Sequence, residues 1–137
     1  TLNTIVAQRL ARKICEHCKT ETELPAETAE TVRNEIGQIP EKTIRKILPD
    51  FDINNLKFYK GKGCARCGNL GYSGRVSIAE VIDINDRLKD IIIDGKRIMK
   101  MDDVKDSQEF ITLRQDGLIK VLLGSTTMEE VLRVIYD

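Results

Sequence analysis

Apolar and polar positions alternate in two stretches of the chain, residues 4–14 and residues 75–83. The first begins with three β-branched residues, and it is short enough to fit either a half-buried strand or a short helix. We favour the strand. The second stretch alternates through Val76, Ile78 and Glu80, and the apolar residues Val81 and Ile82 follow. This pattern predicts another strand, antiparallel to residues 4–13.

Between these stretches the pattern becomes helical. Pro25 suits the start of a helix over residues 26–36 and Gly37 suits its end, because proline fits the first turn and glycine the position after the last. A second helix is expected to begin at Pro40 and to stop before Pro49. Four apolar residues are expected to cover one small core: Leu24, Val32, Ile36 and Ile39.

A helical pattern also follows the second predicted strand. Asn85 can cap a helix that is closed by Gly95. The apolar positions of this helix are Leu88, Ile91 and Ile92. The polar residues 96–108 are expected to form a linker.

The last part of the chain predicts two more helices. A longer one is centred on apolar residues between Phe110 and Leu122 and ends at Gly124. Thr126 and Glu129 have the spacing of a capping box, which predicts the start of a final helix. Three residues of that helix are expected to face inward: Val131, Leu132 and Ile135.

Together the elements predict an α/β chain of the α+β kind, in which a short antiparallel strand pair carries an inserted region and helices follow. Residues 1–14 and 75–84 are expected to be the paired strands. Residues 15–74 are expected to form an insert with a helical excursion, and residues 85–137 a helical subdomain.

The composition narrows the possible functions. The 137 residues include 22 basic and 22 acidic side chains, and the net charge is zero. A balanced charge argues against a general nucleic-acid or membrane-surface binder. No apolar run approaches the roughly 20 residues that span a bilayer, so no direct membrane insertion is expected. The chain begins at Thr1 without a secretory pattern, and we expect a piece of a longer protein in the reducing cytoplasm.

All four cysteines fall into two Cys-x-x-Cys pairs, Cys15 with Cys18 and Cys64 with Cys67. Each pair can present two thiolates from one tight turn, and four thiolates complete the tetrahedron that Zn²⁺ prefers in structural sites. Such a site leaves no open position for a catalytic water. We therefore predict structural zinc and no catalytic residue.

The residues around the cysteines fit this prediction. Basic side chains flank both pairs and suit the negative charge of a zinc tetrathiolate. Glycines can turn the backbone tightly and direct N–H groups at sulfur; they are Gly61, Gly63, Gly68, Gly71 and Gly74.

Other interpretations of the cysteines stay open at this point. A disulfide framework has three possible connectivities, and a thioredoxin-like redox pair would leave the second pair idle. A chaperone-type cysteine-rich domain would need more such repeats. His17 is either a further ligand or an exposed bystander. A zinc-ribbon nucleic-acid module is suggested by aromatic residues among the basic ones: Phe58, Tyr59 and Tyr72.

Several motifs resemble one family, the ATPases that power type II secretion and type IV pilus assembly (GspE/PilB-like). The first motif is Ala7-Gln-Arg-Leu-Ala-Arg-Lys-Ile-Cys15 with Cys18, and the second runs from Gly63 through both later cysteines to Arg75 and Glu80. Near the end come Thr112-Leu-Arg-Gln-Asp-Gly117, Gly124-x-Thr126 and Glu129-Glu-Val-Leu-Arg-Val134. They follow the family's order.

The resemblance implies the carboxyl-terminal part of such a motor, with the two strands belonging to a RecA-like core. The Walker A and Walker B motifs that bind ATP and Mg²⁺ would then lie upstream, and indeed no Gly-x-x-x-x-Gly-Lys-Ser/Thr loop occurs here. The implied partners are the upstream ATPase core, neighbouring subunits of a hexamer, an inner-membrane platform protein and a membrane-docking adaptor. The implied location is the cytoplasm, at the inner membrane through partners.

Overall fold

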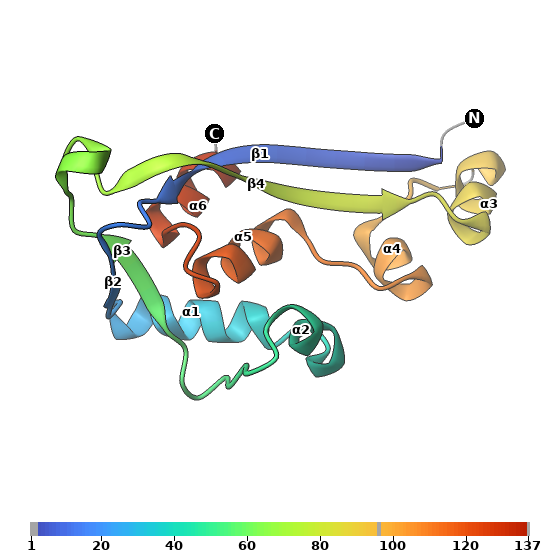
Figure 1. Ribbon diagram of the computed structural model, residues 1–137. Helices are drawn as coiled ribbons and strands as arrows, with labels where there is room; N and C mark the ends of the chain where they lie inside the picture. Colours follow the sequence, from blue (N-terminus) through green and yellow to red (C-terminus); the bar gives the residue numbers. More distant parts are fainter. Residues whose placement is uncertain (1–2, 96, 137) are drawn as a thin grey trace.

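A computed structural model describes residues 3–95 and 97–136, and its longest feature is a two-stranded antiparallel ribbon (Figure 1). Strand β1 (Thr4–Ile14) pairs with β4 (Tyr72–Asp83), so that Thr4 lies opposite Asp83 and Arg12 opposite Arg75. Both predicted strands and their antiparallel pairing are confirmed. The class is α+β.

A second, smaller sheet is formed by residues that lie between β1 and β4 in the sequence. Strand β2 (Lys19–Thr22) pairs antiparallel with β3 (Phe58–Gly61). The sequence pattern does not predict these strands, because a run of four residues is too short to show a period of two.

Six α-helices lie within the described residues. The helices expected at residues 26–36, after Pro40 and after Asn85 are present, and the Asn85 side chain accepts the predicted capping hydrogen bond from Leu88 N at 3.0 Å. The elements are α1 (Ala26–Ile36), α2 (Glu41–Ile47), the 3₁₀ turn η1 (Ala65–Cys67), α3 (Asp86–Asp94), α4 (Met101–Ser107), α5 (Leu113–Leu122) and α6 (Met128–Ile135).

The predicted linker of residues 96–108 is wrong, because it contains α4. The Asp103 carboxylate accepts two hydrogen bonds from Arg97, both at 2.7 Å, and one from Lys100 N at 2.8 Å. Val104 is buried in a cluster with Leu88 of α3. Tertiary packing therefore stabilises a helix whose own sequence is mostly polar.

The longer predicted helix begins later than expected. Phe110 lies outside α5, which starts after Thr112 because that hydroxyl accepts from Gln115 N and the Gln115 side chain accepts from Thr112 N. This is a capping box. Glu80 of β4 accepts from Leu113 N at 2.7 Å, which fastens the same helix end to the ribbon.

The final helix is also shifted by one residue from the prediction. Thr127, not Thr126, caps α6 by accepting from Glu130 N, because the Thr126 hydroxyl donates to Arg12 O of β1. Leu132 was expected to face inward, but it is 39% exposed. Val131 faces inward as predicted, with Ile135 partly buried beside it, and Met128 and Val134 complete the inward face.

The elements form three layers, with α5 between the ribbon and α1 (Figure 1). One buried cluster joins Ile78 of the ribbon, Val32 of α1 and Leu118 of α5. The four residues expected to share a core do so, with Leu24 at its margin. No helix in the described parts of the chain is long and apolar enough to cross a bilayer.

Gly117 sets the distance between α5 and α6. A Cβ atom there would lie 2.7 Å from Val131 Cγ1, and Val131 is fully buried. We expect Gly117→Ala to lower the free energy of unfolding by about 1–3 kcal/mol, because overpacking outweighs the ~1 kcal/mol gain in helix propensity.

Urea denaturation followed by circular dichroism measures this change. Asn34→Ala, at an exposed position of α1, is the matched control and should leave stability equal or slightly higher. Unchanged stability of Gly117→Ala would contradict the close packing.

Candidate metal centre

The four predicted metal ligands meet at one end of the ribbon. Cys15 follows β1 directly and Cys18 precedes β2, while Cys64 caps the turn η1 and Cys67 is its last residue. Pairing of β1 with β4 and of β2 with β3 therefore brings the two Cys-x-x-Cys turns face to face. The cysteines are free thiols, two of them buried and two half-buried.

The sulfur atoms have the spacing of a tetrahedral metal site. Sγ–Sγ distances are 3.8 Å for Cys15–Cys64, 3.9 Å for Cys18–Cys67 and 3.7 Å for Cys64–Cys67. All four sulfurs lie within 4.8 Å of one another. A Zn–S bond of about 2.3 Å places the sulfurs of an ideal tetrahedron about 3.8 Å apart. The donor set thus fits zinc.

Backbone N–H groups point at two of the sulfurs. Gly63 N donates to Cys18 Sγ, and Cys64 N and Gly71 N donate to Cys67 Sγ, each at 3.3 Å. Both glycines have positive φ, 94° and 81°. Gly61 is required for another reason, since a Cβ atom there would lie 2.0 Å from Gly71 O. The glycines allow the turns to approach closely enough to present donors to sulfur.

The surroundings of Cys67 and Cys18 shift the pKa values of these two thiols in opposite directions. Burial alone would raise the pKa of Cys67, but hydrogen bonds from Cys64 N and Gly71 N, with those of Cys64 and Cys18 side chains, lower it to about 6. Burial, supported by the neighbouring thiols and opposed by Gly63 N, raises the pKa of Cys18 to about 11. The N–H donors thus favour the thiolate form of Cys67, which is the form that binds a cation.

His17 lies at the rim of the cluster. It is exposed, and its Nε2 atom lies 3.1 Å from Arg66 Nη1. Among the described residues, the group with metal-binding geometry consists of the four cysteines without this histidine.

Glu130 of α6 is an important residue of this region that the sequence pattern did not single out. Its side chain is 2% exposed and accepts from Arg12 N at 2.7 Å, from the Arg12 guanidinium at 3.1 Å and from Arg133 at 2.9 and 3.0 Å. The Arg12 guanidinium also lies 4.3 Å from the centre of the Tyr72 ring. This carboxylate joins α6 to the strand that leads into Cys15.

These hydrogen bonds change the acidity of Glu130. The bonds from Arg133 are the largest effect, and together with those from Arg12 they outweigh burial and lower the pKa from 4.5 to about 2. The sequence did contain a local signal, because an acidic residue just before apolar helix positions is typical of the first turn of a helix. That signal could not reveal the contact of Glu130 with Arg12, since the two residues are 118 positions apart.

Comparison with known proteins places the chain among secretion and pilus proteins. A family model described as type II/IV secretion system protein matches residues 1–133. The chain is 38% identical over 128 residues to the type IV pilus assembly ATPase PilB of Thermus thermophilus and 37% identical over 137 residues to that of Pseudomonas aeruginosa. It is 31% identical over 134 residues to type II secretion system protein E of Klebsiella pneumoniae.

These alignments cover nearly all of this chain but a small part of the relatives. They include 93%, 100% and 98% of the chain, and 13%, 22% and 23% of the three relatives in the same order. Most of each relative therefore has no counterpart in these residues.

Glu130 provides a test of the contact between α6 and β1. Because its pKa is lower in the folded than in the unfolded chain, its stabilisation is complete above about pH 4.5 and is lost as the pH falls toward 2. We expect Glu130→Gln to lower the free energy of unfolding by roughly 3 kcal/mol at neutral pH, and by progressively less in acid.

Urea denaturation of the wild type and of Glu130→Gln, from neutral pH toward pH 2, measures the difference in their free energies of unfolding. Because both proteins contain the same cysteines, the titration of these cysteines cancels in the difference. Glu129→Gln, at the exposed neighbouring position, should behave like the wild type throughout. A loss in Glu130→Gln that does not vary with pH would refute the ionic role.

Proposed function

The chain belongs to the type II/IV secretion system protein family, and from this we propose that it is the carboxyl-terminal, zinc-binding and helical region of an ATPase that powers type II secretion or type IV pilus assembly. Names of the relatives support this assignment. Its role is structural coupling, and ATP and Mg²⁺ bind to upstream residues. The observation that carries the proposal is the tetrahedral spacing of four sulfurs within this family match.

Cys15, Cys18, Cys64 and Cys67 hold one structural Zn²⁺ ion in this proposal. The Sγ spacing and the N–H donors support zinc. Four sulfur ligands complete its coordination, so the ion supplies stability rather than chemistry. It staples residues 15–74 as an insert between the two ribbon strands, and residues 85–137 form the helical subdomain.

The ribbon is the proposed attachment to a RecA-like core, and its two edges differ. On β4, the Ala79 N–H donates to Asp116 at 2.8 Å, and the Gln108 amide pairs with both Asp83 N and Asp83 O, at 3.1 and 2.9 Å. These side chains occupy the backbone groups that a further strand would need. Because the outer edge of β4 is blocked in this way, β1 is the strand at which a further strand could join the ribbon.

Among the described residues, the outer N–H groups of β1 that have partners lie near the cysteines, while farther along the same edge the Gln8 C=O accepts from Arg9 Nη1 at 3.0 Å. Arg12 N donates to Glu130 and Ile14 N to Ser125 O. Alternate N–H groups share an edge, so Val6, Gln8 and Leu10 present theirs on the same side, without a partner among the described residues. The Val6 and Leu10 side chains are also 59% and 49% exposed. This supports a strand of the upstream core pairing with residues 4–10.

The remaining partners follow from the family. We propose that the full-length protein forms a cytoplasmic hexamer and lies at the inner membrane through a platform protein and a docking adaptor. The balanced charge of this chain supports protein partners rather than nucleic acid.

Zinc content tests the metal assignment. We expect one Zn²⁺ per chain by elemental analysis, and Cys64→Ser to lose the metal and unfold the region around both turns, since structural zinc contributes roughly 10–16 kcal/mol of binding free energy. His17→Ala should retain stoichiometric zinc. A Cys64→Ser protein that keeps its full zinc content would disprove the ligand set.

Hydrogen exchange tests the proposed attachment. In this chain alone, the amides of Val6, Gln8 and Leu10 should exchange rapidly, and in the full-length ATPase they should be protected by strand pairing. The Ala79 amide, already bonded to Asp116, should be protected in both and serves as the reference. Equal, rapid exchange of the three β1 amides in the full-length protein would exclude this edge as the attachment.

A further inference from the structure

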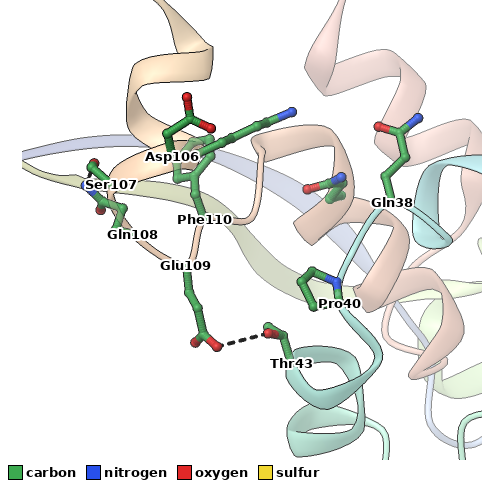
Figure 2. Close-up of a pocket in the computed structure, with 10 residues that line it drawn as sticks. Gln38, Pro40, Thr43, Asp106, Ser107, Gln108, Glu109 and Phe110 are labelled. Carbon is green, nitrogen blue, oxygen red and sulfur yellow. Dashed lines mark hydrogen bonds between the residues drawn. The ribbon is translucent and has the colours of Figure 1, made fainter.

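A polar cavity of about 490 Å³ lies between α2 and the connection from α4 to α5, away from the cysteines (Figure 2). Glu109 closes one side of it by reaching across to α2, where Thr43 donates to Oε1 at 3.2 Å and Lys46 Nζ lies 3.7 Å from Oε2. The volume is within the range of small-ligand sites, about 300–1,000 Å³.

Gln115 lines this cavity with a free donor. The residue is 4% exposed. Its Oε1 atom accepts from Thr112 N at 3.0 Å, which fixes the orientation of the amide because a backbone N–H can only donate. The Nε2 group is then the part of the side chain left for the cavity, and it has no partner among the described residues. An amide donor without a protein partner, held in a largely buried side chain that lines a cavity, is available to a bound acceptor.

The charges around the cavity favour a ligand with a negative oxygen. Both acidic residues of the lining already have basic partners outside it, since Glu109 contacts Lys46 and Asp106 lies 4.0 Å from Arg87. Lys105 lines the same cavity and has no counterion in the described part of the chain. Among the charged residues of the lining, the exposed Lys105 is therefore the one without an ionic partner, and Gln115 adds an amide donor from the buried side.

We propose that this cavity binds a carboxylate, with Gln115 Nε2 donating to one oxygen and Lys105 supplying the opposite charge. A charge-assisted hydrogen bond to a desolvated carboxylate is among the stronger polar contacts in proteins. The carboxylate comes from a small acid or from an acidic side chain of a peptide. This site is independent of the metal and of the ATPase assignment.

Nuclear magnetic resonance of the whole 137-residue chain tests the site. Succinate and a capped tetraglutamate peptide are titrated separately to millimolar concentration, with sodium chloride at matched ionic strength as the reference. We expect one of the carboxylates to shift the Gln115 side-chain NH₂ resonances and the Lys105 resonances in a saturable manner. Saturation by succinate alone identifies a small acid, and saturation by the peptide alone identifies an acidic segment.

Gln115→Glu is the decisive variant. It keeps the oxygen that caps α5, as in the Thr-x-x-Glu capping box, but replaces the donor by a negative oxygen. We expect it to weaken binding about tenfold or more, and Lys105→Met to weaken it less. Lys60→Met, at an exposed position of β3, should bind normally. Shifts reproduced by chloride, no saturable shift with either carboxylate, or undiminished binding by Gln115→Glu would overturn the proposal.

Discussion

The antiparallel ladder between β1 and β4 is the interaction on which the rest of the structure depends. It joins residues as distant as Thr4 and Asp83, and closing such a long loop costs conformational entropy that local contacts alone could not offset. Once formed, the ladder brings both Cys-x-x-Cys turns to one end and provides the face on which α5 packs. Glu80 and Asp116 then join α5 to β4 through backbone N–H groups.

The insert and the terminal helices support one another. Val32 and Ile36 of α1 share a buried cluster with Leu118 of α5 and Ile78 of the ribbon. Burial of apolar surface is roughly additive in area, so neither part keeps its full core without the other. Glu130 adds a polar connection from α6 to the strand beside Cys15. The cysteine centre is thus held from both sides, by the two short strands and by the last helix.

The two edges of the β1–β4 ribbon differ in how many of their backbone groups have hydrogen-bond partners. One ribbon edge is occupied by side chains of Gln108 and Asp116, while on the other the N–H groups of Val6, Gln8 and Leu10 have no partner among the described residues. Since exposed strand edges promote unwanted pairing, we propose that a strand of the full-length protein covers the edge beside the exposed residues Val6 and Leu10. The relatives, which are several times longer than the aligned region, have residues to complete it.

The sequence by itself determined the two long strands, the helices that have clear caps and the four-cysteine set, because alternation, Pro and Gly positions and Cys-x-x-Cys spacing are local signals. Tertiary structure decided the rest. Helix α4 depends on Val104 packing against Leu88, and the four-residue strands depend on each other. The final helix starts at Met128 because Thr126 is used by Arg12 O. The sulfur geometry and the role of Glu130 likewise require contacts between residues far apart in the chain, and no local pattern encodes such contacts.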